Sequence, residues 1–440
     1  MSELSFIDVG TIVAEDIKHK ALEERRNNNS PVGKYADNQS FKNLTGEDVF
    51  NFEENKKKLI ADLDWLVHLE VEEFTFRKKW EEMQFLNDDI KDFYNQAKAK
   101  IWTPTDLNNE ELTIKEINEL QPKTVLVSGD YYELLWTVLR YYCSSAEYNQ
   151  APGRFFKFLM VDDITGKVLG ISSVASDVIC ISDRDEYIGW TPEDKLQHKR
   201  LKHSAIGTTI VPTQPFGTNF LGGKLIAALV TSSVVRNAWE SKSGSGVGCK
   251  LVGMTTTSLY GNSKKNFSMY NGLKWWKPVG LSKGKVPIKP YEKGYYDWHQ
   301  WLKQSKDFKD EYVKAMTQKE GIKGPVTGAK MRVLNMIFKA CKIRQSSYCH
   351  GNCRGVYYSC FYENTKDFLC GKITEDKLVM KSLFKDDTNA ILEWWRPKSV
   401  QRYLRLKSEG RLNPEKLFYN EMTGMPYEEA KNLYLGELGR

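Results

Sequence analysis

The sequence contains no apolar run long enough to cross a bilayer, which takes about 18 consecutive apolar residues. Its N-terminal segment carries early acids and has no apolar core followed by a small-residue cleavage site, so it is not typical of a signal peptide. Eight cysteines without such a signal favour free thiols or a metal site over a disulfide framework. We therefore expect a cytoplasmic protein (in the host cytoplasm if phage-encoded) without a membrane partner.

The sequence also lacks an internal repeat and a strong charge of one sign. Its 64 basic and 57 acidic residues leave a net charge of +7, a mild bias that is consistent with a polyanionic partner. Hydrophobic residues make up 41%, which is enough for a globular chain with a buried core. A length of 440 residues predicts two or three domains.

The pattern along the chain divides it into four parts. Polar residues interrupted by an Asn run and a Pro-Val-Gly turn predict a flexible arm over residues 1–40. Leucines and aromatic residues at helical spacing predict a helical subdomain over residues 41–120, which packs on the rest or binds a protein partner. A central domain over residues 121–290 and a mixed C-terminal domain over residues 291–440 follow.

In the central domain, short β-rich runs alternate with helical patterns. This alternation predicts an α/β (or α+β) fold, a mixed sheet flanked by helices. The expected strands are Thr124–Val127, Phe155–Val161, Val168–Ser173, Thr208–Val211 and Lys250–Thr256. The expected helices are Tyr132–Tyr142 and Gly222–Asn237.

A glycine-containing turn with Gly217, Gly222 and Gly223 joins the fourth expected strand to the long apolar helix. Free backbone amides at a helix start can hold a pyrophosphate, and glycine lets the backbone approach a phosphate closely. A glycine-rich turn before a helix is also common for packing reasons, so both interpretations stay open.

The order of these segments resembles the GNAT acyltransferase superfamily. The matching parts are the hairpin at residues 154–174, the strand, turn and helix at residues 208–237, and Tyr270 with Gly272, Leu273 and Gly280. The resemblance implies a GNAT-like fold that uses acyl-CoA or another acyl donor, with Tyr270 as the acid for the leaving group. The implied donor-binding residues are Val211, Gln214, Gly217, Gly222 and Gly223. Phe216 stands where the superfamily usually has Arg or Gln before the first glycine.

An N-acyltransfer also needs a base for the incoming amine. The candidates are the acids Asp183, Asp185 and Glu186 after the third expected strand, and His203, because a buried carboxylate or a near-neutral imidazole can accept a proton. Asp185 is equally compatible with a structural ion pair to Arg184 beside Trp190.

A second resemblance, over about residues 140–285, is to the DruA-like proteins known from the Druantia anti-phage system, mobile elements and phages. The matching runs are Gly166–Gly170, Ser182–Trp190, Tyr270–Trp276 and Val279–Gly284. This resemblance implies a role in phage–host conflict or nucleic-acid modification.

Two basic, aromatic-rich segments, Leu273–Lys293 and Trp394–Arg411, favour a nucleic-acid partner, DNA in preference to RNA. Cations beside stackable rings suit a single-stranded or flipped-base substrate, and they also occur as solvated basic faces. The candidate residues are Lys274, Trp275, Trp276, Lys277, Lys283, Arg396, Arg402 and Arg405.

The cysteine cluster between Cys341 and Cys370 includes His350 but has no pair of two-spaced knuckles. Buried thiols therefore fit it better than structural zinc, and we predict no metal site. Our first functional hypothesis is a GNAT-like N-acyltransferase that modifies nucleobase amines in a phage or anti-phage setting. The alternative is a catalytically inactive GNAT-like module that binds nucleic acid, which the Phe216 departure favours.

Overall fold

The computed structural model describes residues 50–148, 153–241, 249–259, 268–282, 284–288, 292–317, 329–351, 353–385, 387–414 and 422–438. The chain splits into two compact units. The helical unit comprises Met1–Phe74 and Lys285–Asn352, and the sheet unit comprises Thr75–Gly284 and Cys353–Arg440. The expected arm over residues 1–40 lies outside the described residues, and the expected boundaries near residues 120 and 290 stay predictions.

A seven-stranded mixed sheet forms the centre of the sheet unit, with the strand order β1-β2-β3-β4-β5-β9-β6. The strands are β1 Pro122–Leu126, β2 Phe155–Asp162, β3 Val168–Ser176, β4 Ser204–Pro212, β5 Gly253–Ser258, β6 Lys277–Leu281 and β9 Gly355–Cys360. Neighbouring strands run antiparallel except β4 and β5, which run parallel. Because β9 comes from the C-terminal part of the chain and pairs between β5 and β6, the sheet joins distant segments.

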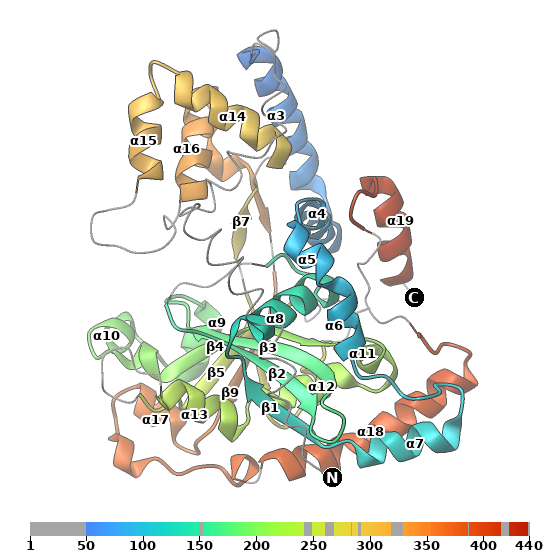
Figure 1. Cartoon of the computed structure of the whole chain (residues 1–440). Helices are drawn as coiled ribbons and strands as arrows, with labels where there is room; N and C mark the ends of the chain where they lie inside the picture. The colour runs from blue at the N-terminus through green and yellow to red at the C-terminus, as the bar shows by residue number, and fades with distance from the viewer. Residues whose placement is uncertain are drawn as a thin grey trace. The chain divides into compact units, whose positions relative to one another are not determined.

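Helices cover both faces of this sheet, as the mixed α/β prediction requires (Figure 1). Trp136 of α8 (Asp130–Cys143) donates its indole N–H to the Ser172 carbonyl of β3, 3.0 Å away. The other face packs on α12 (Gly222–Leu229) and α13 (Ser233–Ser241), and its core includes Phe158, Leu225 and Trp239. Side chains alternate across a strand, so β3 buries both of its faces.

The hairpin expected at residues 154–174 is confirmed, and the side chains of its turn explain why the chain reverses there. Asp162 accepts hydrogen bonds from the Thr165 backbone and hydroxyl, and Gly166 supplies a positive φ of 65°. The helix expected at Gly222–Asn237 is instead two helices. The Thr231 hydroxyl donates to the Ala228 carbonyl at 2.7 Å, a local side-chain bond that competes with helix continuation between them.

The remaining helices of the sheet unit surround this core. Their bounds are α5 Asp88–Asp92, α6 Tyr94–Lys100, α7 Glu110–Glu119, α9 Ser182–Ile188, α10 Pro192–Leu196, α11 Phe216–Asn219, α17 Thr365–Leu369, α18 Asp387–Ser408 and α19 Tyr427–Leu438. Helix α4 (Val71–Gln84) begins in the helical unit and ends in the sheet unit. None of the helices that the structure describes combines the length and apolar character of a membrane span.

The helical unit has a core of its own. It includes Leu63, Trp298 and Ile337, contributed by α3 (Phe52–His68), α14 (Glu292–Gln304) and α16 (Ala329–Cys341). Helix α15 (Lys309–Met316) and a two-stranded sheet of β7 (Lys285–Pro287) and β8 (Cys349–Gly351) complete its described part. The leucine stripe that predicted a helical N-terminal region therefore faces a core built with segments more than 200 residues later in the sequence.

Candidate functional site at the diverging strands

The parallel strands β4 and β5 pair only at their first residues. Their register runs from Ser204 opposite Gly253 to Gly207 opposite Thr256. Both strands continue beyond this point, but within these fully described strands the pairing ends there. The sheet therefore opens on the β5 side of the later part of β4, which includes Val211.

Tyr270 lies at the point where the two strands part. The Thr256 hydroxyl donates to the Gly207 carbonyl at 3.1 Å, and the Tyr270 hydroxyl lies 3.3 Å from the Thr256 oxygen. Because Thr256 has one proton and gives it to the carbonyl, Tyr270 is the donor in the second bond. The Tyr270 ring is 3% exposed and packs edge-on against Trp276. Burial raises the pKa of Tyr270 well above its usual value, so the phenol stays protonated at neutral pH.

The predicted donor-binding turn follows β4. A Cβ at Gly217 would lie 2.5 Å from the Gln214 amide, and a Cβ at Gly222 would lie 2.5 Å from the Phe216 ring. The Gln214 side chain is buried and accepts hydrogen bonds from the Thr218 backbone and hydroxyl. These contacts give Gly217 and Gly222 a packing role, whereas a Cβ at Gly223 would meet Met269 at 3.3 Å.

Cations from distant segments lie beside this turn. Arg402 of α18 donates to the Thr218 carbonyl at 3.4 Å, and burial lowers its pKa, as do the charges of Arg405 and Arg411. Lys224 donates to the carbonyls of Met269 and Asn271, and burial, then the charge of Lys398, lowers its pKa. The turn that lacks the usual Arg or Gln in sequence therefore receives positive charge from α12 and α18.

The two predicted basic segments meet in the structure, but their tryptophans are core residues. Trp275 and Trp276 are 2% and 3% exposed. The Trp276 indole donates to the Ala227 carbonyl at 2.6 Å, and the Trp275 ring packs edge-on against Trp394 of α18. Neither indole forms a surface platform for base stacking.

The basic side chains have different surroundings. Lys274, Lys277 and Arg405 are exposed, whereas Arg396 is partly buried and donates to the Leu120 carbonyl at 2.8 Å. Lys283 lies outside the described residues. The nucleic-acid role of these residues stays a prediction, now carried by the cations alone.

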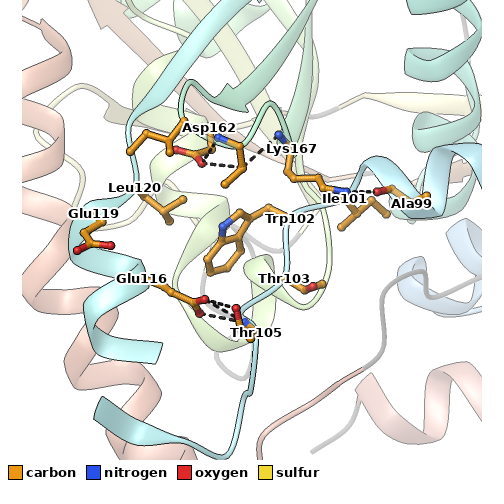
Figure 2. Close-up of a pocket in the computed structure, with 12 residues that line it drawn as sticks. Ala99, Ile101, Trp102, Thr103, Thr105, Glu116, Glu119, Leu120, Asp162 and Lys167 are labelled. Atoms are coloured by element: carbon orange, nitrogen blue, oxygen red, sulfur yellow. Dashed lines mark hydrogen bonds between the residues drawn. The ribbon is translucent and has the colours of Figure 1, made fainter. Parts of the chain in front are cut away.

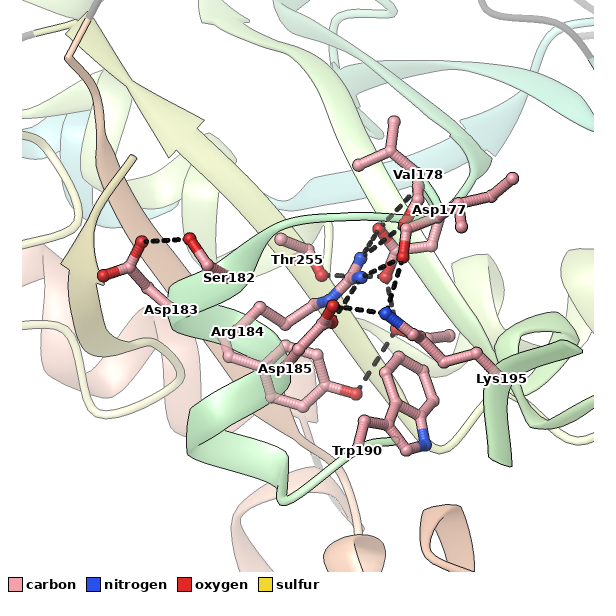
Figure 3. Close-up of polar contacts among 12 residues, drawn as sticks. Asp177, Val178, Ser182, Asp183, Arg184, Asp185, Trp190, Lys195 and Thr255 are labelled. Carbon is pink, nitrogen blue, oxygen red and sulfur yellow. Dashed lines mark hydrogen bonds and ion pairs between the residues drawn. The ribbon is translucent and has the colours of Figure 1, made fainter. Parts of the chain in front are cut away.

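Asp185, one candidate base, belongs to a buried ionic network (Figure 3). Its carboxylate pairs with Arg184 at 2.6 Å and with Lys195 at 2.5 Å. Arg184 is fully buried, pairs with Asp177 at 2.6 Å and lies over the Trp190 ring. The structural ion pair beside Trp190, the alternative interpretation of Asp185, is therefore present, and the role of Asp185 as a base stays a prediction.

Asp177 directly follows β3 and connects three elements of the sheet unit, α9, β4 and β5. Its carboxylate accepts hydrogen bonds from Arg184, from the Ser204 hydroxyl in β4 at 2.6 Å and from the Thr255 hydroxyl in β5 at 2.8 Å. Burial raises the pKa of Asp177, while the Arg184 charge and these hydrogen bonds oppose the increase. The sequence alone does not indicate this role for Asp177, since its only local signal is an acid directly after a β-rich run.

His203, the other candidate base, lies just before β4. Its Nδ1 is 2.8 Å from the Lys250 carbonyl, which only accepts, so this nitrogen carries the proton of the neutral ring. Its ring packs edge-on against Phe368. Burial lowers the pKa of His203 to about 4, so the ring is neutral at pH 7. Its role as a base stays a prediction.

The cysteine-containing segment is divided between the units. Cys341, Cys349 and His350 belong to the helical unit, and Cys353, Cys360 and Cys370 belong to the sheet unit. The described residues include no group of three or more metal-ligating side chains. His350 stacks on Phe74 with ring centroids 4.1 Å apart, and its Nε2 lies 2.6 Å from the Leu69 carbonyl.

A pocket of about 280 Å³ lies beside Trp102, between α6, α7 and the β2–β3 turn (Figure 2). Two of its acids accept backbone hydrogen bonds, Glu116 from Thr105 and Asp162 from Gln121, and the third, Glu119, lies 3.9 Å from the Lys115 ammonium. The Trp102 ring also packs edge-on against Phe216 and Phe220, next to the glycine turn. None of the predicted site residues lines this pocket.

Comparison with known proteins adds a family to this geometry. Residues 78–371, more than half of the chain, match the family described as Druantia protein DruA. The Druantia protein DruA of Escherichia coli (strain UMEA 4076-1) is 25% identical over 264 residues, which cover 57% of this chain and 61% of that protein. The chain thus matches less than two thirds of its relative's length. No solved structure matches the chain. On the extent of the family match, the chain belongs to the DruA family.

Proposed function

We propose that this chain is an N-acyltransferase that modifies nucleic acid in an anti-phage setting. The observation that carries the proposal is the Tyr270 hydroxyl, which acts as a donor where β4 and β5 part. A proton donor at the opening between two parallel strands matches the role that the GNAT resemblance implies for this tyrosine. Membership of the DruA family supports the anti-phage setting.

The sheet topology agrees with this proposal. It has one parallel pair in an otherwise antiparallel sheet, and the later part of β4 leads into the glycine turn and α12. Backbone groups of β4 beyond Gly207 are free of β5, and an N–H among them could stabilise an oxyanion. Lys224 and Arg402 beside the turn fit a donor that carries phosphates.

An acyl-CoA or similar donor would supply a carbonyl that is open to attack by an amine. The amine nitrogen would bond to the carbonyl carbon and lose one proton to a base, while the bond from that carbon to the leaving group breaks. Tyr270 holds its proton at neutral pH because burial raises its pKa, and it would give this proton to the leaving group. Lys224 and Arg402 would bind the donor through their charges. Exposed cations on α18, among them Lys398 and Arg405, would attract the nucleic acid strand.

The test begins with calorimetric titration of the full chain with acetyl-CoA and longer acyl-CoA thioesters. The protein is then incubated with the donor that binds and with single- or double-stranded oligonucleotides, and the nucleosides are analysed by mass spectrometry. We expect saturable donor binding and a nucleoside whose mass has increased by one acyl group. Absence of both donor binding and acylated nucleoside would rule out a CoA-dependent transferase.

Substitution of the turn cations provides the internal control for donor binding. The double variant Lys224→Gln/Arg402→Gln should bind the donor at least tenfold more weakly, because it loses both charges beside the turn. Lys407→Gln on the same helix should bind as the wild type does, since Lys407 pairs with Glu110 at 3.1 Å.

A second function is favoured by the packing of the turn. Gly217 and Gly222 are in tight contact with Gln214 and Phe216, so these glycines have a structural reason that needs no phosphate. The alternative is therefore a nucleic-acid-binding component without catalytic activity. Oligonucleotide binding without response to any acyl-CoA would select this function.

A further inference from the structure

Two lysines lie over the ring of Tyr187 at the β6 edge of the sheet, and a third, Lys381, lies next to the end of strand β9. Strand β6 is the last in the strand order and carries Lys277, while Tyr187 lies on α9 next to it. Lys366 comes from α17, and Lys381 follows the bridge between Tyr362 and Met380. These four residues come from segments up to about 190 residues apart, so the sequence does not show them as one group.

The lysine ammonium groups lie close to one ring. The Nζ of Lys366 is 3.6 Å from the Tyr187 ring centroid, and the Nζ of Lys277 is 5.0 Å from it. The Tyr187 hydroxyl is 3.9 Å from the Cys360 sulfur. The Lys381 backbone N–H donates to the carbonyl of Phe361, the residue after Cys360, at 3.1 Å. Burial raises the pKa of the Cys360 thiol, and the charges of all three lysines oppose that increase.

Helices α9 and α17 also carry the acids Asp183, Glu186 and Asp367, but none of them is paired with these lysines in the part of the chain that the structure describes. None of the three lysines forms an ion pair with a described carboxylate, and the neighbouring acid Asp367 pairs with Lys372 at 3.6 Å. A cation–π contact with one tyrosine offsets only part of the repulsion among three like charges. A surface of this kind favours a bound anion.

We propose that Lys277 and Lys366, which lie over Tyr187, and Lys381 beside the end of β9 bind the phosphodiester backbone of a nucleic acid strand. The contact is with phosphates and not with a stacked base, because Lys366 already occupies a face of the Tyr187 ring. The proposal rests on the proposed function, in which nucleic acid is the substrate. It adds a second contact region, formed by β6, α9 and α17, to the cations of α18.

The test compares two triple variants of the full chain that change the net charge equally. Lys277→Gln/Lys366→Gln/Lys381→Gln removes the proposed surface. Lys91→Gln/Lys115→Gln/Lys123→Gln removes three lysines that pair with carboxylates elsewhere on the sheet unit. Fluorescence anisotropy with a labelled oligonucleotide over a salt series gives the affinity and its salt dependence, and circular dichroism checks that both variants are folded.

We expect the first variant to bind about tenfold or more weakly at low salt. Its slope of log affinity against log salt should fall by about 2, as the loss of two to three phosphate contacts requires. The control variant should stay within about twofold of the wild type. Equal losses in both variants, or none in the first, would overturn the proposed surface while oligonucleotide binding by the wild type still supports the proposed function.

Two further outcomes separate the alternatives. If the wild type binds no oligonucleotide, both the surface and the nucleic-acid part of the proposed function are wrong. If the first variant keeps oligonucleotide affinity but loses binding to vesicles of anionic phospholipid, the surface recognises lipid phosphate instead.

Discussion

At the scale of single residues, the proposal depends most on the hydroxyl of Tyr270. Replacement by Phe removes this proton donor and keeps the ring that packs against Trp276 and Tyr357. We expect Tyr270→Phe to lower the turnover of nucleoside acylation by about 10²-fold or more, the usual contribution of a positioned acid. The free energy of unfolding should fall by only about 1 kcal/mol, because one buried hydrogen bond is lost.

Tyr357→Phe provides the matched control for this measurement. The Tyr357 ring is 4.9 Å from that of Tyr270, but its hydroxyl donates to the Asn271 side chain at 2.9 Å. Steady-state rates and urea unfolding of both variants separate chemistry from stability. Wild-type turnover in Tyr270→Phe would exclude the tyrosine as the acid.

His203 makes stability depend on pH. Its pKa is about 4 in the folded protein, below its ordinary value of 6.5, so the unfolded chain binds more protons between these two values. Stability should therefore be complete above about pH 6.5 and fall as the pH decreases toward 4, by up to about 3 kcal/mol. Urea unfolding at a series of pH values measures this dependence.

The variant His203→Asn tests the assignment. The Asn amide can take the place of Nδ1 and donate to the Lys250 carbonyl, but it does not titrate. We expect the decrease in stability between pH 6.5 and 4 to become shallower by the His203 contribution. An unchanged pH profile would show that other groups cause it.

Asp177 tests the buried network. Asp177→Asn removes the negative charge that faces Arg184. It also leaves one side-chain oxygen in place of the two that accept hydrogen bonds from Arg184, Ser204 and Thr255 in the wild type. Loss of one partner from a buried ion pair costs about 3–5 kcal/mol, so we expect a loss of that order in chemical unfolding. Asp367→Asn, in the exposed pair with Lys372, should change stability by less than about 1 kcal/mol. Similar effects of the two substitutions would contradict a structural role for the network.

At the scale of elements, α18 connects the glycine turn to the exposed cations Lys398 and Arg405. Trp395, fully buried, donates to the Phe220 carbonyl at 3.0 Å and fixes the helix to the turn. Pro397 lies inside this helix, where it removes one backbone donor. Because Trp395 fixes the helix, α18 holds Arg402 against the turn, while Lys398 and Arg405 remain exposed.

This arrangement predicts that oligonucleotide affinity and its salt dependence both rely on the exposed cations of α18. The variant Lys398→Gln/Arg405→Gln should weaken oligonucleotide binding several-fold and lower the salt slope by between about 1 and 2, because two phosphate contacts are lost. Lys407→Gln, whose ammonium pairs with Glu110, is the control on the same helix. Anisotropy titrations at several salt concentrations measure both. A loss confined to Lys407→Gln would place the binding surface elsewhere.

At the scale of the whole molecule, the two units have separate cores. Leu225 belongs to the core of the sheet unit, and Ile337 belongs to the core of the helical unit; both are fully buried. We expect scanning calorimetry to resolve two transitions, because chains with separate cores often depart from two-state unfolding. Leu225→Ala should lower one transition and Ile337→Ala the other, each by the equivalent of about 2–5 kcal/mol. A single transition that shifts with either substitution would show one cooperative unit.

Local patterns in the sequence determined much of the sheet. Alternating apolar residues and the Asp162–Gly166 turn sufficed to predict β2 and β3, because a hairpin is encoded within one short segment. The apolar periodicity of residues 132–142 similarly predicted α8. The two resemblances placed Tyr270 after the β5 strand, and one of them identified the family that the comparison with known proteins supports.

Tertiary structure decided what these segments contact. Strand β9 enters the sheet between β5 and β6 from about 75 to 105 residues away, and no local pattern encodes such pairing. The lysines around Trp275 and Trp276 predict an exposed basic, aromatic surface. Both rings are nevertheless buried, because neighbouring helices supply the apolar contacts that large rings favour. Asp177 and the Lys277–Lys366–Lys381 group depend on side chains from several elements, and only the folded chain brings their charges together.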